Sequence, residues 1–394
     1  MDKLDRITDV MGSVELDVLI SSSSENSVYM GDISSLSGPL VTGSPVCVLT
    51  FRDRSRDATI LSPIGLADLL AKRESPIQDI RLYGTFFISS SERTNLTKES
   101  EELHNILGQD VYPNIYDAIS SILSRHGIEK GKVGIDETNF SPFQFRTLRN
   151  KLHEIEVVEA SDIFRRIRMK KSKGEIAKLE KAVEVTEFAW STVLESVKEG
   201  ITEQDMSRTY MEALVSRNAL PYFHVIAIGE RSALPNAPTS SRRLGKGDLI
   251  RLDGGCEYEH YKADIARIAV YGPPSQKHID YYDALLKGEK AAIDQIRPGT
   301  KCSDLFATAV ETVRKSGIPH YRRHHCGHGI GLEMYDPPLV SPYDQTRLEE
   351  GMVLNIETPY YELGFGGLQV EDTILVTESG SRRLTKSSQD LRVL

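Results

Sequence analysis

The stretch RLDGGCEYEHYKADIAR, residues 251–267, decides the fold of the second half of this 394-residue chain. Apolar residues precede Asp253, two glycines follow it, and Asp264 comes eleven residues later, directly before the apolar run 265–270. This pattern predicts a buried strand that ends at Asp253 and a hairpin that leads to a second buried strand. A hairpin of that length brings both carboxylates to one end of a sheet.

Three residues further along the chain share this setting. His328 lies in the glycine-rich run CGHGIG, whose glycines permit close backbone approach, and Glu357 and Glu371 each adjoin an apolar run of strand length. Buried carboxylates are costly unless they are paired or bind a metal. Four carboxylates and one imidazole therefore predict an oxygen-rich site for two bridged divalent ions. The alternative, in which each acid is separately paired with a lysine or arginine, fits one such acid better than five.

Composition narrows the class of protein. Hydrophobic residues make up 39% of the chain and the formal net charge is −9, which is ordinary for a globular protein and argues against a nucleic-acid-binding face. No apolar run reaches the roughly 18 residues of a membrane span, and the N-terminal segment lacks the apolar core of a signal peptide. Because the four cysteines are widely scattered, we expect free thiols and a cytoplasmic location.

The length of the chain predicts two domains, 1–162 and 163–394. In the first, helical periodicity at 4–11 and 115–123 alternates with strand-like runs such as 46–51, which predicts an α/β layer domain. We find no catalytic constellation there. Serine-rich stretches that predict loops lie at 21–24, 35–37 and 89–91.

The second domain is expected to open with two helices. The first begins at Ser172, where Glu175 completes a capping box, and Gly200 closes it. The second covers about 203–217, and strand patterns dominate after it.

The motifs of the second domain resemble the metallopeptidases of pita-bread fold, a family that includes methionine aminopeptidase, aminopeptidase P, prolidase, creatinase and ectoine hydrolase. The resemblance covers about 165–380, and the spacings are most similar to those of prolidases. The first half resembles the N-terminal accessory domain of creatinase and prolidase. The matching runs are RMKKSKGEI at 168–176, the stretch at 251–267, HHCGHGIGL at 324–332, VLNIETP at 353–359 and LQVEDTILV at 368–376.

This resemblance implies an α+β fold, with a curved antiparallel sheet and covering helices behind an α/β domain. It assigns as metal ligands the same five residues, Asp253, Asp264, His328, Glu357 and Glu371. It also implies two divalent ions (Mn, Co, Fe or Zn) and a homodimer, while no nucleic-acid or membrane partner is expected.

Three positions depart from the pattern of the family. Asn236 and Tyr335 stand where the peptidases carry histidines, and Gln369 stands where an arginine often lies. The resemblance implies that those histidines hydrogen-bond the substrate carbonyl and the tetrahedral intermediate. His324 keeps a further family histidine, and its neighbour His325 is expected to be exposed.

These departures shape the predicted function. Asn236 donates a hydrogen bond but carries no proton, and Tyr335 donates as well. Because losing one donor to the intermediate costs roughly 10²–10³ in rate, dipeptide hydrolysis is placed in doubt. We therefore expect a hydrolase that cleaves an amide-type C–N bond of a small amino-acid-derived substrate, with a hydroxide bridging the two ions as nucleophile. The residues expected to assist are Asn236, His324, Tyr335 and Gln369.

Several other functions remain open from the sequence. The first alternative is a conventional Xaa-Pro dipeptidase or aminopeptidase, for which the three replacements are neutral. A lyase that uses the same metals, and a binding protein of the same fold without catalysis, are further alternatives.

Overall fold

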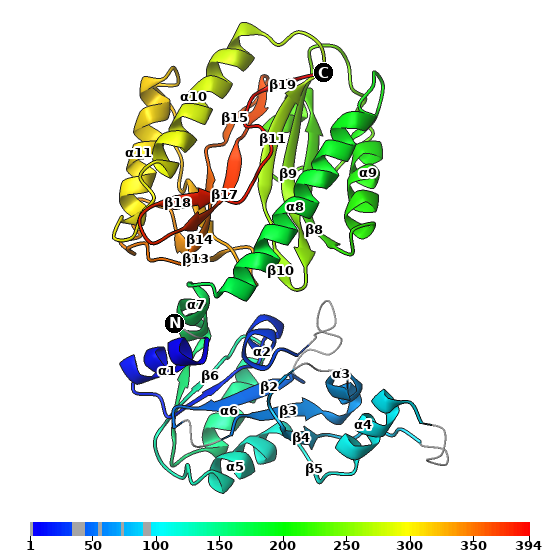
Figure 1. The fold of residues 1–394 in the computed structure, drawn as a ribbon, viewed down its shortest axis with the longest axis vertical. Helices are drawn as coiled ribbons and strands as arrows, with labels where there is room; N and C mark the ends of the chain where they lie inside the picture. Colours follow the sequence, from blue (N-terminus) through cyan, green and yellow to red (C-terminus); the bar gives the residue numbers. More distant parts are fainter. Residues whose placement is uncertain (1–2, 34–43, 54–56, 72–74, 90–95) are drawn as a thin grey trace. The chain divides into compact units, whose positions relative to one another are not determined.

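The structure is a computed structural model, and it describes residues 3–33, 44–53, 57–71, 75–89 and 96–394. The chain divides into two units, Met1–Ile167 and Arg168–Leu394 (Figure 1). The loops predicted at 35–37 and 90–91 lie outside the described residues. Within the described ranges, no helix is both long and apolar enough to cross a membrane.

The first unit is built on a mixed sheet with helices packed around it, which confirms the predicted α/β domain. Strand β1 pairs antiparallel with β2 and parallel with β6. Across the described sheet the order is β5 (Val111–Tyr112), β4 (Asp79–Tyr83), β3 (Thr59–Pro63), β2 (Cys47–Phe51), β1 (Val18–Ile20), β6 (Lys132–Ile135) and β7 (Glu156–Glu159). Its helices are α1 (Lys3–Ser13), α2 (Ser24–Gly31), α3 (Asp68–Ala71), α4 (Lys98–Leu107), α5 (Ile115–Arg125), α6 (Pro142–Lys151) and α7 (Ser161–Arg168).

The serine-rich stretch at 21–24 is more than a loop, because Ser23 caps α2. The same segment surrounds the buried side chain of Asp136. The carboxylate of Asp136 accepts hydrogen bonds from the Ser23 amide (2.8 Å), Asn26 Nδ2 (2.7 Å) and Thr138 Oγ1 (2.5 Å). Burial opposes ionisation of Asp136, but these donors outweigh it and lower the pKa of its carboxyl group.

The second unit contains a curled sheet in which nearly all neighbours are antiparallel, as the pita-bread fold requires. In order it contains β10 (Tyr261–Lys262), β9 (Leu249–Tyr258), β11 (Ile265–Val270), β17 (Glu371–Val376), β14 (Val353–Glu357), β12 (Gly327–Gly329) and β13 (Asp336–Leu339). Three more strands attach to it: β8 (Leu220–Ile228) to β9, β18 (Ser381–Arg383) to β17 and β19 (Arg392–Val393) to β11. Strands β15 (Tyr360–Glu362) and β16 (Gly366–Leu368) form a separate hairpin.

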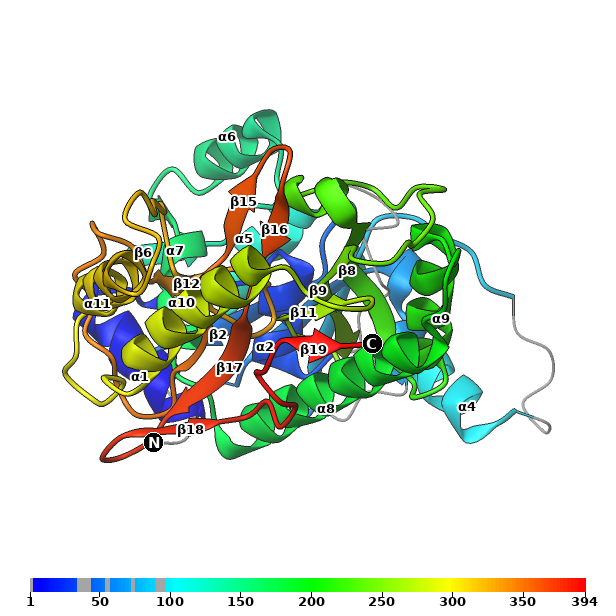
Figure 2. The same ribbon diagram turned by 90° about the horizontal axis from the view of Figure 1, so that it is seen from above.

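Two pairs of helices cover this sheet (Figures 1 and 2). Helices α8 (Lys173–Ser196) and α9 (Glu203–Val215) pack on β9 and β8, and α10 (Gln276–Ile293) contacts β14 and pairs with α11 (Cys302–Lys315). The predicted capping box at the start of α8 is present. The predicted end at Gly200 is wrong: α8 ends at Ser196, because Val197 is already extended.

The prediction that a strand ends at Asp253 is also wrong, since β9 continues to Tyr258. Glycine makes this continuation possible. A Cβ on Gly255 would lie 1.6 Å from the carbonyl oxygen of Ala263, and one on Gly254 would lie 2.3 Å from that of Phe223. Strand β8 and the segment between β10 and β11 therefore approach β9 closely at the two glycines that follow the first carboxylate.

Candidate metal centre

The five residues predicted as ligands are all buried; four lie on neighbouring strands, and Asp264 directly precedes β11. Strand pairing sets Asp253 opposite Ala266, Ala266 opposite Glu371, and Glu371 opposite Glu357. Side chains two residues apart on a strand share a face, so Asp264 points to the same side as Ala266. The register alone therefore gathers the four carboxylates on one face of the sheet.

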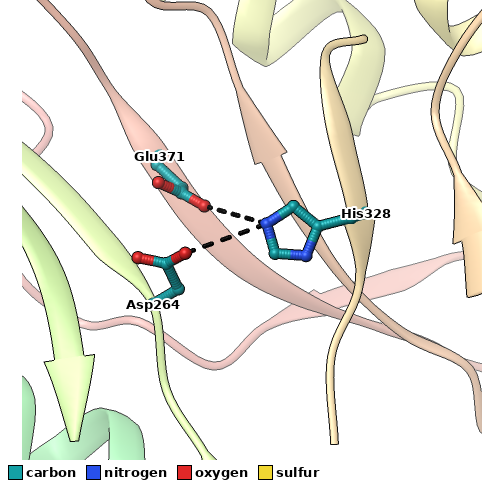
Figure 3. Close-up of side chains that lie close together, drawn as sticks. All are labelled: Asp264, His328 and Glu371. Carbon is teal, nitrogen blue, oxygen red and sulfur yellow. Dashed lines mark ion pairs between the residues drawn. The ribbon is translucent and has the colours of Figure 1, made fainter. Parts of the chain in front are cut away.

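His328 joins this face from β12, where it pairs with Asn355, two residues before Glu357. Its Nε2 lies 3.8 Å from Asp264 Oδ2 and 3.8 Å from Glu371 Oε1 (Figure 3). The imidazole Nδ1 lies 3.0 Å from the carbonyl oxygen of Gly329 and donates to it. This bond leaves the lone pair of Nε2 directed at the carboxylates, and burial lowers the pKa of His328, which favours the neutral ring that metals bind.

The charges of the cluster fit divalent cations. Burial, together with repulsion among the acids, raises the pKa of Asp264 and of Glu371 well above the ordinary value, and burial raises that of Asp253 to about 6. Asp264 Oδ1 is buried and has no hydrogen-bond partner among the described residues. One atom each of Asp264, His328 and Glu371 lie within 4.8 Å of one another, a separation that a shared ion could span.

Glu357 differs from the other acids because a histidine approaches it. His325 Nδ1 lies 3.1 Å from Glu357 Oε1. Although burial opposes ionisation, His325 and the nearby Arg323 lower the pKa of Glu357. The expectation that His325 is exposed is therefore wrong. Its neighbour His324 is the exposed residue of the pair, because the chain at this point turns the second ring inward.

The other three predicted site residues take different places. Gln369 is buried, and its Nε2 lies 3.4 Å from Glu357 Oε2 and 3.4 Å from Glu371 Oε2, so the amide bridges two of the acids. Tyr335 stacks on the ring of His328 at a centroid distance of 3.9 Å, with 48% of its surface exposed. Asn236 is exposed and follows the short helix η3 (Gly229–Ala233).

Sequence reasoning missed Arg251, although it lies in the quoted stretch. Arg251 is fully buried, and its Nη1 donates to Asp253 Oδ2 over 2.8 Å. The two side chains share one face of β9 because they lie two residues apart. Asn355 was missed as well, and its Nδ2 donates to Glu371 Oε1 over 3.0 Å.

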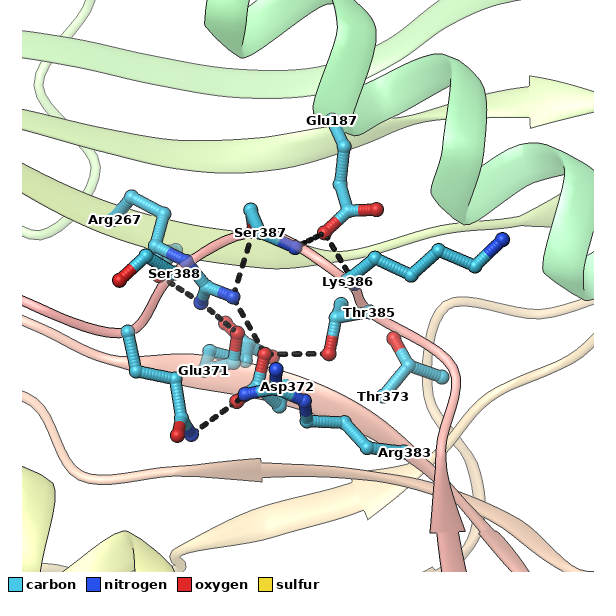
Figure 4. A network of polar contacts seen from close by, with 12 residues as sticks. Glu187, Arg267, Glu371, Asp372, Thr373, Arg383, Thr385, Lys386, Ser387 and Ser388 are labelled. Atoms are coloured by element: carbon cyan, nitrogen blue, oxygen red, sulfur yellow. Dashed lines mark hydrogen bonds and ion pairs between the residues drawn. The ribbon is translucent and has the colours of Figure 1, made fainter.

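The opposite face of β17 carries an ionic network of a different kind (Figure 4). Asp372 accepts from Arg267 Nη2 (2.6 Å), Thr385 Oγ1 (2.5 Å) and Gln389 Nε2. Arg267 is therefore paired with the acid that directly follows Glu371 in the sequence. Arg267 Nη1 also donates to the carbonyl oxygen of Glu371 over 2.7 Å, so this network holds the backbone that carries Glu371.

Cys256 and Cys326, which lie close in sequence to Asp253 and His328, are packing residues. Both are buried and all four cysteines are unpaired. Cys256 Sγ contacts the carbonyl oxygen of Ala182 in α8 over 3.4 Å. Burial raises the pKa of Cys256 to about 11 and so disfavours the thiolate that metals bind.

Comparison with known families agrees with this geometry. The model of metallopeptidase family M24 matches residues 177–378, and that of the creatinase/prolidase N-terminal domain matches residues 3–170. The chain belongs to metallopeptidase family M24. It is 38% identical to the Xaa-Pro dipeptidase of Pyrococcus horikoshii over 254 residues, which are 64% of this chain and 72% of the relative. It is 37% identical to that of Pyrococcus furiosus over 262 residues, which are 66% of this chain and 75% of the relative.

Solved structures are similar over the full length of the chain. The prolidase from P. horikoshii OT3 superposes with a TM-score of 0.79 at 28% identity and covers 99% of both chains. The Xaa-Pro dipeptidase from Bacillus anthracis gives a TM-score of 0.81 at 22% identity, covering 100% of this chain and 99% of the other, and at that identity shows the fold alone. The predicted pita-bread fold and the assignment to a metal-dependent peptidase family are confirmed.

Proposed function

We propose that this M24 family member hydrolyses dipeptides, with Xaa-Pro dipeptides as its first candidate substrates. The proposed metal ligands are Asp253, Asp264, His328, Glu357 and Glu371, which would hold two divalent ions. The observation that supports this most is the convergence of His328, Asp264 and Glu371 in a chain 38% identical to an Xaa-Pro dipeptidase. This function replaces our first expectation of a non-peptide substrate, because the relatives favour peptidase chemistry.

The chain's own residues supply orientation around the ions. Divalent ions in such a site activate a water molecule and polarise the scissile carbonyl. Gly329 fixes the ring of His328 from behind through Nδ1, and Tyr335 covers its face. Gln369 holds Glu357 and Glu371 at a fixed separation. Tyr335 is 48% exposed, and its hydroxyl group is the proposed donor of a hydrogen bond to a bound substrate.

A second candidate is hydrolysis of another small amide. The three replacements, Asn236, Tyr335 and Gln369, favour it, because they remove two titratable histidines and one cation from the pattern of the family. The proposed ligands are the same for both candidates. The two candidates differ in the substrate that is cleaved, a dipeptide or another small amide.

A substrate panel separates these candidates. The purified chain is treated with chelator, reloaded with Mn²⁺, Co²⁺, Fe²⁺ or Zn²⁺, and assayed on Xaa-Pro dipeptides, on dipeptides without proline and on small N-acyl amino acids. We expect metal-dependent turnover of dipeptides, greatest for Xaa-Pro. Turnover of the other amides alone would favour the second candidate, and no turnover by any metal-loaded form would contradict both.

The identity of the metal, a homodimeric state and a cytoplasmic location remain part of this proposal. The four buried, unpaired cysteines support a reducing compartment. Metal analysis of the purified chain and measurement of its mass in solution test the first two directly.

A further inference from the structure

A buried arginine lies among the acids of the proposed centre. Arg251, on β9, has no exposed surface, and its Nη1 donates both to Asp253 Oδ2 (2.8 Å) and to Gln369 Oε1 (3.1 Å). The same oxygen of Gln369 accepts from the Tyr361 hydroxyl over 3.2 Å, while its Nε2 contacts Glu357 and Glu371. Arg251 therefore reaches one acid directly and two more through a single amide.

The other end of the guanidinium holds a surface segment. Arg251 Nη2 donates to the carbonyl oxygens of Leu234 (2.9 Å) and Pro235 (2.8 Å), the two residues before Asn236. Its charge also lies 5.2 Å from the ring centroid of Tyr361. Because a guanidinium is a planar fork of donors, one side chain can join these groups in a fixed geometry.

We propose that Arg251 is a positioning residue of the metal centre. It orients Asp253 and Gln369 for metal binding, and it ties the segment that carries Asn236 to the centre. In this chain Arg251, on β9, provides a positive charge that the neutral Gln369 does not. The inference rests on the metal site of the proposed function but not on its substrate.

The arrangement predicts that an arginine at position 369 is tolerated only when Arg251 is replaced at the same time. Nη1 of Arg251 and Oε1 of Gln369 lie 3.1 Å apart, so an arginine at 369 would meet the existing guanidinium. The Q369R variant alone places two like charges together in a buried site. In R251M/Q369R, one arginine again stands beside the acids.

Calorimetric titration of the metal-free chain with Mn²⁺ tests this directly. We expect R251M to bind Mn²⁺ about 10–100-fold more weakly than the parent, since loss of a group that orients a ligand typically costs that much. R251K keeps the charge without the fork and should fall between the two. Q369R should bind at least about 10-fold more weakly than R251M/Q369R, by the same reasoning on orientation. R243M, at an exposed arginine outside the centre, is the control for purification and folding.

Two results of the Mn²⁺ titration would contradict the proposal. If Arg251 acted only as a repelling charge, R251M would bind Mn²⁺ as tightly as the parent or more tightly, and this result would overturn the proposal. A double variant no better than Q369R would overturn it as well.

Hydrogen exchange provides a readout that needs no metal. We expect the amides of residues 229–238 to exchange faster in metal-free R251M than in metal-free parent, while the core of β14 stays protected. If the parent bound no Mn²⁺, the proposed function would fail, yet faster exchange would still support the tie to the Asn236 segment. Unchanged exchange in a folded R251M would overturn that tie.

Discussion

Glu371 and Asp372 are adjacent residues of β17 and are both buried, but their pKa values shift in opposite directions. On one face, Glu371 lies among three other acids, and burial together with their repulsion raises its pKa. On the other face, Asp372 is surrounded by Arg267, Arg383 and hydroxyl and amide donors. Burial opposes its ionisation, but these groups outweigh it and lower its pKa.

The difference is that neighbouring protein groups balance the negative charge of Asp372 but not that of Glu371. Asp372, like Asp136 in the first unit, obtains its partners from the protein, so its role is structural. Glu371 and Asp264 concentrate negative charge where, among the described residues, no lysine or arginine side chain forms an ion pair with them; their basic neighbour is His328, whose burial favours the neutral ring. Such a cluster is stable at neutral pH when cations bind it.

The largest expected effect comes from E371Q. This variant should lose at least about 100-fold in Mn²⁺ affinity, because even groups that only orient a ligand cost 10–100-fold. Metal-free E371Q should melt no lower than the metal-free parent, since an amide removes one repelling charge and can still accept from Asn355. Calorimetry and thermal unfolding measure the two effects. Metal affinity equal to that of the parent would remove Glu371 from the centre.

Its matched partner D372N should show the reverse pattern. It leaves Arg267 as a buried cation without its closest anion, which costs about 3–5 kcal/mol of unfolding free energy. The added stabilisation on saturation with Mn²⁺ should persist, because the ligands are unchanged. Urea unfolding with and without metal measures both quantities. A D372N variant as stable as the parent would show that the two faces do not differ as described.

A smaller effect should appear in the pH dependence of the metal-free chain. A carboxyl whose folded pKa is raised binds protons in the folded state first, so folding gains stability as pH falls from about 6, the pKa of Asp253, toward the unfolded value of about 4. Asp372 contributes oppositely: its stabilisation is present above its unfolded pKa and is lost as pH falls below it. The melting temperature should therefore rise between pH 7 and about pH 5 and fall below about pH 4. A steady fall from pH 7 downward would contradict the raised pKa values.

Much of this site was predictable because strand register depends on local pattern. Apolar runs beside Asp253, Glu357 and Glu371 predicted buried strands, and a common face follows from pairing. The position of Arg251 follows from the same rule, since it lies two residues before Asp253, but an arginine is ordinarily expected at the surface rather than in the core.

Other features depend on tertiary contacts that no local pattern reports. His324 and His325 are adjacent in a loop, and only the folded chain shows that the second faces Glu357. Strand β9 continues past Asp253 because the two glycines that follow let neighbouring backbones approach closely. In the sequence alone, the same glycines predict the end of the strand. Helix α8 likewise ended before the glycine expected to close it.

The central claim is that Asp253, Asp264, His328, Glu357 and Glu371 together hold divalent ions. Anomalous diffraction at the manganese edge, from crystals grown with Mn²⁺, tests it most directly. The account predicts two peaks on this face of the sheet, each within coordination distance of these side chains. Peaks elsewhere, or acids that stay paired with protein donors at saturating Mn²⁺, would contradict it.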